Sequence, residues 1–259
     1  TESGSAPAFL YTIPNFHNPT GLTADQAKRE EVLRLCEDYG VPIVEDGFEE
    51  EMKYFGKAVL PIKSMDRRGI VLYIGTCSKV LFPGIRVGWI AAEKEAVRRL
   101  RAVQKVSNLC GWMVDQAAVG LFCMKGMYDA HIKRMQRVYR RRMETAISSL
   151  EMHMPRDTVS WTKPSGGYVI WLHIRNAGVR EEDVLRKLAE RGVLLSPGSF
   201  FFGPRSSEVH MNEGPSFRLS LGTTDEKEIE AGIRVIGETL LSSARGRKRD
   251  EAPSFRSSS

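Results

Sequence analysis

The sequence has few cysteines and histidines and no long apolar run. Its 259 residues contain four cysteines and five histidines, without a Cys-x-x-Cys pair or a His/Cys spacing typical of a metal site. So few cysteines in so long a chain argue against a disulfide framework, which indicates reduced thiols and a cytoplasmic location. No stretch approaches the roughly 20 apolar residues that a membrane helix requires, so we expect neither a metal nor a membrane contact.

The N-terminal residues also lack the features of a secretory signal. Residues 1–6 are polar and small, and they contain neither a basic region nor an apolar core. The chain does not begin with methionine. We therefore expect it to be a piece of a longer protein.

An excess of positive charge is present, but it is unevenly distributed. The formal net charge is +6, and the segment 245–259 contains five basic and two acidic residues, which is half of the excess. This Ser/Arg-rich segment is predicted to be a disordered basic tail. The other basic run lies on a predicted helix at 128–150. A solvated helix face is the favoured interpretation of that run, and a nucleic-acid contact is the alternative.

Short apolar runs alternate with helical patterns in the first hundred residues. The predicted strands are 9–13, 41–46, 70–75 and 86–92. Thr23 is predicted to cap a helix that ends near Glu37, with Leu33, Leu35 and Cys36 on its inner side. Strands that are apolar throughout and separated by helices predict a parallel sheet covered on both faces.

The rest of the chain has the pattern of a small α+β domain. Beyond the long helix, strands are predicted at 159–161, 166–172, 193–195 and 217–221, and helices at 180–191 and 225–241. The predicted organisation is a large domain over 1–130, a small domain over 131–244 that is joined by the helix, and the tail over 245–259. The fold class is α/β.

One loop carries the densest set of reactive side chains. Thr76, Ser78, Lys79 and Arg86 follow the third predicted strand closely. A lysine amine can form an imine with a carbonyl ligand, and hydroxyls with a guanidinium bind a phosphate well. A surface lysine beside a solvated arginine is the alternative. Asn18, Asp46 and Lys79 all fall at carboxyl ends of predicted strands, where ligands of such sheets bind.

The segment 76–88 resembles the lysine motif of the class I/II aminotransferases, which are fold-type I enzymes that use pyridoxal 5'-phosphate (PLP). The Asn-Pro-Thr-Gly sequence at 18–21 is similar to a turn of that family, and 44–46 to its cofactor-aspartate strand. Arg218 is similar to its carboxylate-binding arginine. The resemblance covers about 10–241 and implies a fold-type I PLP-transferase with an incomplete large domain and a small α+β domain.

The resemblance also implies a role for each matched residue. Lys79 would hold PLP as a Schiff base and then move a proton between the substrate and the cofactor. Asp46 would keep the pyridine nitrogen protonated, with a strand-end cap as the alternative. Asn18 would donate to the cofactor O3' and take part in substrate binding, and its bond to Pro19 is a candidate cis peptide. The alternative for this segment is an ordinary turn.

The remaining implied roles concern the phosphate and the substrate. Thr76, Ser78 and Arg86 would bind the cofactor phosphate. Arg218 would bind the substrate carboxylate, with a structural ion pair as the alternative. Many relatives have a tyrosine shortly after the aspartate, but here Phe48 and Glu49 stand in its place. One hydrogen bond to O3' is therefore expected to be missing.

A narrower resemblance leads to two functional hypotheses. The segments 45–54, 79–83 and 131–142 are similar both to the aminotransferase-like domain of MocR-type GntR regulators and to 2-aminoadipate-type aminotransferases. The first hypothesis is an aminotransferase, acting as a homodimer on an amino acid and a 2-oxo acid. The alternative is a regulator domain that binds PLP with little turnover and reaches DNA only through a separate N-terminal domain. Decarboxylase, lyase or racemase chemistry on the same fold is a third possibility.

The family also has a stretch before the first predicted strand, and no counterpart of it is recognisable in this sequence. That stretch carries a glycine-rich phosphate loop, an aromatic residue that stacks on the pyridine ring, and further strands of the large domain. We therefore expect open sheet edges and an incomplete site.

Overall fold

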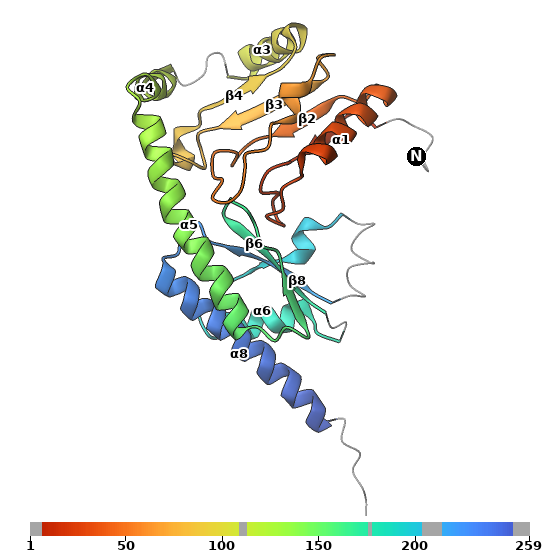
Figure 1. Cartoon of the computed structure of the whole chain (residues 1–259), viewed down its shortest axis with the longest axis vertical. Helices are drawn as coiled ribbons and strands as arrows, with labels where there is room; N and C mark the ends of the chain where they lie inside the picture. The colour runs from red at the N-terminus through yellow and green to blue at the C-terminus, as the bar shows by residue number, and fades with distance from the viewer. Residues whose placement is uncertain (1–6, 109–112, 176–177, 204–213, 251–259) are drawn as a thin grey trace, which may run out of the picture. The chain divides into compact units, whose positions relative to one another are not determined.

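The structure is a computed structural model that describes residues 7–108, 113–175, 178–203 and 214–250. It divides into two compact units, one formed by 1–139 with 164–167 and the other by 140–163 with 168–259. The helix α5 (Met127–His153) belongs to the first unit in its N-terminal part and to the second in its C-terminal part (Figure 1).

The first unit contains a four-stranded sheet with the strand order β1-β2-β3-β4. Its strands are β1 (Leu10–Thr12), β2 (Ile43–Asp46), β3 (Val71–Thr76) and β4 (Gly88–Ala91). The β1–β2 and β2–β3 pairs are parallel, whereas β3 and β4 are antiparallel. The prediction that all four strands are parallel is therefore wrong for β4. The chain reverses direction through the loop 77–87, which includes η1 (Pro83–Ile85), so no crossover helix is needed.

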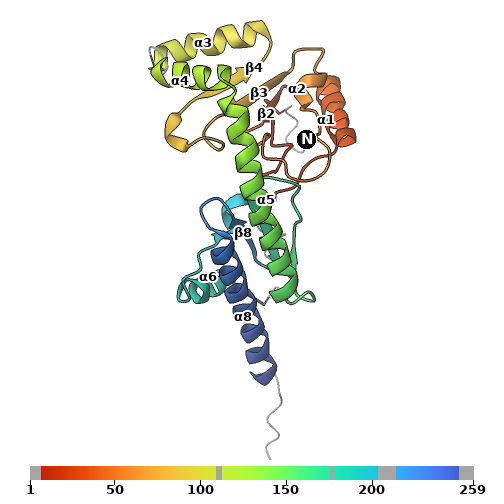
Figure 2. The same cartoon turned by 60° about the vertical axis from the view of Figure 1, so that its left-hand side comes forward.

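Helices cover part of this sheet. The helices of the first unit are α1 (Gln26–Tyr39), α2 (Ile62–Met65), α3 (Lys94–Asn108), α4 (Met113–Met124) and the start of α5. α1 and α2 pack on the sheet through a buried cluster formed by Leu33, Cys36, Val41, Ile43, Ile62 and Val71. Figure 2 shows α1 and α2 beside each other. Burial of these apolar side chains is the main stabilisation of the unit.

The start of α1 differs from the prediction. Asp25, and not Thr23, is the N-cap, because its carboxylate accepts a hydrogen bond from the Lys28 amide at 2.8 Å. The Thr23 hydroxyl instead accepts from the Phe16 amide at 3.3 Å. Leu35 was also predicted to be buried, but it is 41% exposed.

Several apolar residues of the first unit are exposed. All four residues of β4 are exposed, so the predicted cover on both faces is wrong for this strand. Among the described residues, no further strand pairs with β1 or β4. α3 and α4 were not predicted, and the described part of α4 has no buried residue. Val114 and Met124 of α4 are 82% and 80% exposed.

The second unit contains a second sheet with the order β5-β6-β8-β7, in which every pair is antiparallel. Its strands are β5 (Val159–Trp161), β6 (Val169–Ile174), β7 (Ser196–Pro197) and β8 (Ser216–Ser220). Its other elements are α6 (Glu181–Ala189), η2 (Gly198–Phe201) and α8 (Glu226–Asp250). The strand predicted at 193–195 is displaced to β7.

The last helix begins with a reciprocal cap. Asp225 accepts from the Glu228 amide at 2.9 Å, and the Glu228 carboxylate accepts from the Asp225 amide at 2.8 Å. α8 continues to Asp250, so the predicted disordered tail is wrong for its first residues, and 251–259 lie outside the described residues. No helix in the described part of the chain is long and apolar enough to cross a membrane.

Two glycines of α8 provide a test of the packing between this helix and the end of α5. A Cβ at Gly237 would collide with the His153 carbonyl oxygen, whereas a Cβ at Gly232 meets no atom within 4 Å. We expect Gly237→Ala to lower the free energy of unfolding by about 1–3 kcal/mol through overpacking. Gly232→Ala should raise it by about 1 kcal/mol through helix propensity. Urea denaturation of both variants checks this, and equal stabilisation by the two would contradict the packing.

Candidate functional site

Parallel strand pairing brings most of the predicted site residues to one edge of the first sheet. Asp46 is the last residue of β2 and Thr76 the last of β3, and these two strands are parallel neighbours. Asn18 lies in the turn that follows β1, which is parallel to β2. Gly88 at the start of β4 pairs with Thr76, so Arg86 approaches the same edge. This is the edge at which α/β sheets bind ligands.

The Asp46 carboxylate has two hydrogen-bond donors. Its Oδ2 accepts from the Tyr11 hydroxyl at 2.6 Å, and its Oδ1 accepts from the Phe48 amide at 3.1 Å. Burial, together with the hydrogen bond to Asp46, raises the pKa of Tyr11 to about 12, so this hydroxyl stays a donor near neutral pH. The two donors fix the orientation of the carboxylate at the strand end.

Tyr11 was not predicted as a site residue. It is paired with Val44 across the β1–β2 ladder, so Tyr11 and Asp46 share one face of the sheet. The alternation of side chains along a strand would have indicated this neighbour once the register was known. The register itself is not readable from the sequence alone.

Asn18 lies half-buried in the turn between β1 and α1. Its bond to Pro19 is cis, as the sequence suggested. The turn is closed by hydrogen bonds from the His17 amide to the Leu22 carbonyl at 2.8 Å and from the Gly21 amide to the His17 carbonyl at 2.5 Å. Asn18 is therefore presented by a hydrogen-bonded loop.

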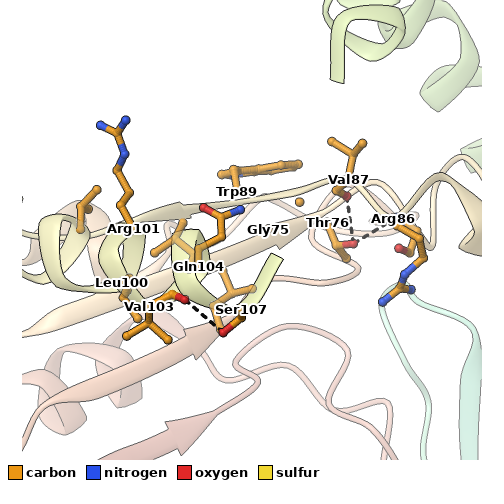
Figure 3. A pocket seen from close by; sticks show the side chains of 15 residues that line it. Gly75, Thr76, Arg86, Val87, Trp89, Leu100, Arg101, Val103, Gln104 and Ser107 are labelled. Carbon is orange, nitrogen blue, oxygen red and sulfur yellow. Dashed lines mark hydrogen bonds between the residues drawn. The ribbon is translucent and has the colours of Figure 1, made fainter. Parts of the chain in front are cut away.

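The loop after β3 presents the hydroxyls and the two cationic side chains. The Thr76 hydroxyl accepts from the Ser78 amide at 3.1 Å and donates to the Val87 carbonyl at 3.4 Å (Figure 3). Lys79 and Arg86 are exposed. Arg86 has a left-handed backbone with a φ of 49°, which aims its side chain differently from those of the adjoining strand.

A hollow of about 680 Å³ lies between β3, β4 and helix α3. Thr76, Ser78 and Arg86 line it, together with Trp89 and several residues of α3 (Figure 3). Asp46 and Lys79 are not among its lining residues. The hollow therefore meets the candidate site only at the end where the hydroxyls and Arg86 lie.

Arg218 belongs to the second unit, where an aromatic cluster surrounds it. It lies on β8, and its Nη2 donates to the Ser196 hydroxyl of β7 at 3.2 Å. Its Cζ lies 4.9 Å from the centroid of the Phe201 ring, a cation–π contact. The Trp171 ring meets Phe201 edge-to-face at 5.9 Å. The contact with Phe201 restricts the orientation of the Arg218 guanidinium. This contact was not predicted from the sequence.

The described residues contain no cluster of three or more His, Cys, Asp or Glu side chains that could hold a metal ion. The reactive groups that the sequence singled out at this edge are the amine of Lys79, the carboxylate of Asp46, the amide of Asn18 and the guanidinium of Arg86.

Comparisons with known proteins give a consistent result. The chain is 36% identical to aromatic-amino-acid aminotransferase 1 of Thermococcus litoralis over 92% of its length and 55% of the relative. It is 31% identical to the HTH-type transcriptional regulator YdfD of Bacillus subtilis over 92% of its length and 47% of the relative. The chain thus spans about half the length of these curated relatives.

A solved structure is similar over most of the chain. It is that of LysN, the alpha-aminoadipate aminotransferase of Thermus thermophilus, complexed with N-(5'-phosphopyridoxyl)-L-leucine. The TM-score is 0.83 at 29% identity, with 94% of this chain and 61% of the other covered.

The profile of the family described as aminotransferase class I and II matches residues 4–236, which is most of the chain. The ordered motifs, the strand-end geometry and the similarity to solved aminotransferases agree with this match. The chain belongs to the class I and II aminotransferase family.

Proposed function

We propose that the protein binds PLP at the carboxyl edge of the first sheet. The proposed ligands are Lys79 for the aldehyde carbon, Asp46 for the pyridine nitrogen, Asn18 for O3', and Thr76, Ser78 and Arg86 for the phosphate. The observation that carries this proposal is that Asp46 and Thr76 end neighbouring parallel strands, with Asn18 following the third. These groups match the aldehyde, the pyridine nitrogen and the phosphate of PLP. The phosphopyridoxyl ligand of the similar LysN structure supports PLP as the cofactor.

The proposed activity is the transfer of an amino group between an amino acid and a 2-oxo acid. Bound PLP supplies an electron sink for the substrate Cα. The Lys79 amine would hold the cofactor and, once the substrate amine has displaced it, would move a proton between the substrate Cα and the cofactor C4'. Asp46, held by Tyr11 and Phe48, keeps the pyridine nitrogen protonated. The named activity of the Thermococcus litoralis relative supports this function.

Arg218 is the proposed ligand of the substrate carboxylate. A guanidinium can bind a carboxylate with two parallel hydrogen bonds. Ser196 and Phe201 restrict the rotation of the Arg218 side chain before substrate binds. This restriction reduces the entropy that binding would otherwise cost.

A second candidate function is a PLP-binding domain of a transcription regulator with little turnover. The 31% identity to the regulator YdfD over 92% of this chain favours it. Phe48 is also compatible with it, since a phenylalanine donates no side-chain hydrogen bond to O3'. A half-reaction assay with the full-length protein distinguishes the two, because only an enzyme converts its cofactor with an amino acid at a catalytic rate.

The remaining proposals concern the cellular location, the oligomeric state and the partners of the protein. We propose a cytoplasmic homodimer, with DNA reached only through an additional N-terminal domain if the protein is a regulator. Three cysteines of the described residues are free, which supports a reducing compartment.

The cofactor linkage is testable by spectroscopy. We expect the full-length protein to gain visible absorbance with PLP and Lys79→Ala to lose it, because no other group in the proposed site can form the covalent linkage. Lys57→Ala, which removes an exposed lysine outside the site, should leave the spectrum unchanged. An unaltered spectrum in Lys79→Ala contradicts the assignment.

The role of Arg218 is testable by kinetics. Arg218→Lys keeps the charge but loses the bidentate geometry, so KM for the amino acid should rise about 10–100-fold. The visible absorbance of the bound cofactor should not change. The control is Arg186→Lys in α6, where the arginine is exposed and bonds to Glu190 at 3.1 Å. An unchanged KM together with a lowered free energy of unfolding would assign Arg218 a structural role.

A further inference from the structure

The segment 14–24 forms a closed loop between β1 and α1. The Ala24 amide donates to the Pro14 carbonyl at 2.8 Å, so the two ends of the loop meet. Inside it, the His17 amide donates to the Leu22 carbonyl at 2.8 Å. Asn18 lies at the far end of this loop. Its position therefore depends on how firmly the two ends are held.

Arg29 of α1 holds both ends of the loop. Its side chain makes four hydrogen bonds: Nε to the Ala24 carbonyl at 3.0 Å, Nη2 to the Pro14 carbonyl at 3.2 Å, Nη2 to Asn15 Oδ1 at 2.6 Å, and Nη1 to the Leu60 carbonyl at 3.0 Å. Three of the four acceptors belong to the loop, and the fourth precedes α2. All four are neutral oxygens.

The burial of Arg29 makes these bonds costly to lose. The residue is 1% exposed and is among the largest fully buried side chains of the described residues. A buried charge without hydrogen-bond partners is strongly unfavourable, so the acceptors must stay in place around the guanidinium. The fork of the guanidinium reaches acceptors in several directions at once, and a lysine ammonium cannot reproduce that geometry.

We propose that Arg29 is a positioning residue of the cofactor site, which clamps the ends of the 14–24 loop and thereby holds Asn18 against O3' of PLP. The inference rests on the proposed role of Asn18. Arg29 does not touch the cofactor itself, because its bonds go to the loop ends and to Leu60.

A core arginine that only stabilises the fold would behave differently from a clamp. A purely structural role predicts effects on unfolding that are independent of Asn18. A clamp predicts that the spectroscopic effect of changing Arg29 passes through Asn18. The two single variants and their double variant therefore separate the roles, because coupled residues are not additive.

The test uses the full-length protein with PLP and follows the pH midpoint of the visible absorbance of the lysine-bound cofactor. Asn18→Ala removes a donor to O3' and should raise the midpoint. Arg29→Lys should raise it in the same direction and weaken PLP binding about tenfold. The double variant should shift the midpoint no further than Asn18→Ala alone. Arg34→Lys is the control, since Arg34 is an exposed residue of the same helix.

Hydrogen exchange of the apoprotein gives a second readout that does not require the cofactor. In Arg29→Lys, the amides of His17 and Ala24 should exchange faster, because they close the loop. If Arg29→Lys does not fold, Asn15→Ala takes its place, since it removes one bond and leaves the guanidinium. It should produce smaller shifts in the same directions.

The outcomes separate the two proposals. An unchanged midpoint in Asn18→Ala overturns the role of Asn18 itself. A shifted midpoint in Asn18→Ala with an unchanged or additive effect of Arg29→Lys overturns the clamp alone. Unchanged midpoint and exchange in Asn15→Ala overturn the clamp when the arginine variant is unfolded.

Discussion

The parallel pairing of β1 with β2 and of β2 with β3 is the constraint on which the candidate site depends. The carboxyl ends of parallel neighbours lie at the same edge of the sheet. Residues that are far apart in the sequence are therefore brought together by the backbone pairing. Asp46 and Thr76 are positioned by the backbone ladder, and Asn18 by the loop that follows it. The hydrogen bond from Tyr11 restricts the Asp46 side chain, and the hydrogen bond from Arg29 to the Pro14 carbonyl restricts the loop that carries Asn18.

The sequence singled out candidate reactive groups, but it did not indicate the side chains that contact or support them. Asn18, Asp46 and Lys79 are recognisable because each stands in a short motif near a strand end. Tyr11 and Arg29 carry no such signal, since one acts across a strand register and the other through backbone carbonyls. Their roles arise from tertiary contacts, which local sequence patterns do not encode.

The same limit applies to the fold. The strands and the long helix were predicted from their apolar patterns, although their ends differ by a few residues. The antiparallel direction of β4 was missed, because strand direction depends on the connection and not on the strand. The helices α3 and α4 were not predicted, and α4 buries none of its described residues. Asp25 replaced Thr23 as the cap because Thr23 bonds to Phe16 instead.

The exposed apolar side of α4 has a consequence for handling the protein. Met113, Val114 and Met124 are 72%, 82% and 80% exposed, and among the described residues no strand pairs with the outer edge of β4. Exposed apolar side chains and unpaired strand edges promote association or aggregation when they are left uncovered. The described part of the chain, produced by itself, is therefore expected to remain monomeric only at low concentration. Its solubility would therefore be governed by the exposed apolar side chains of α4 and β4.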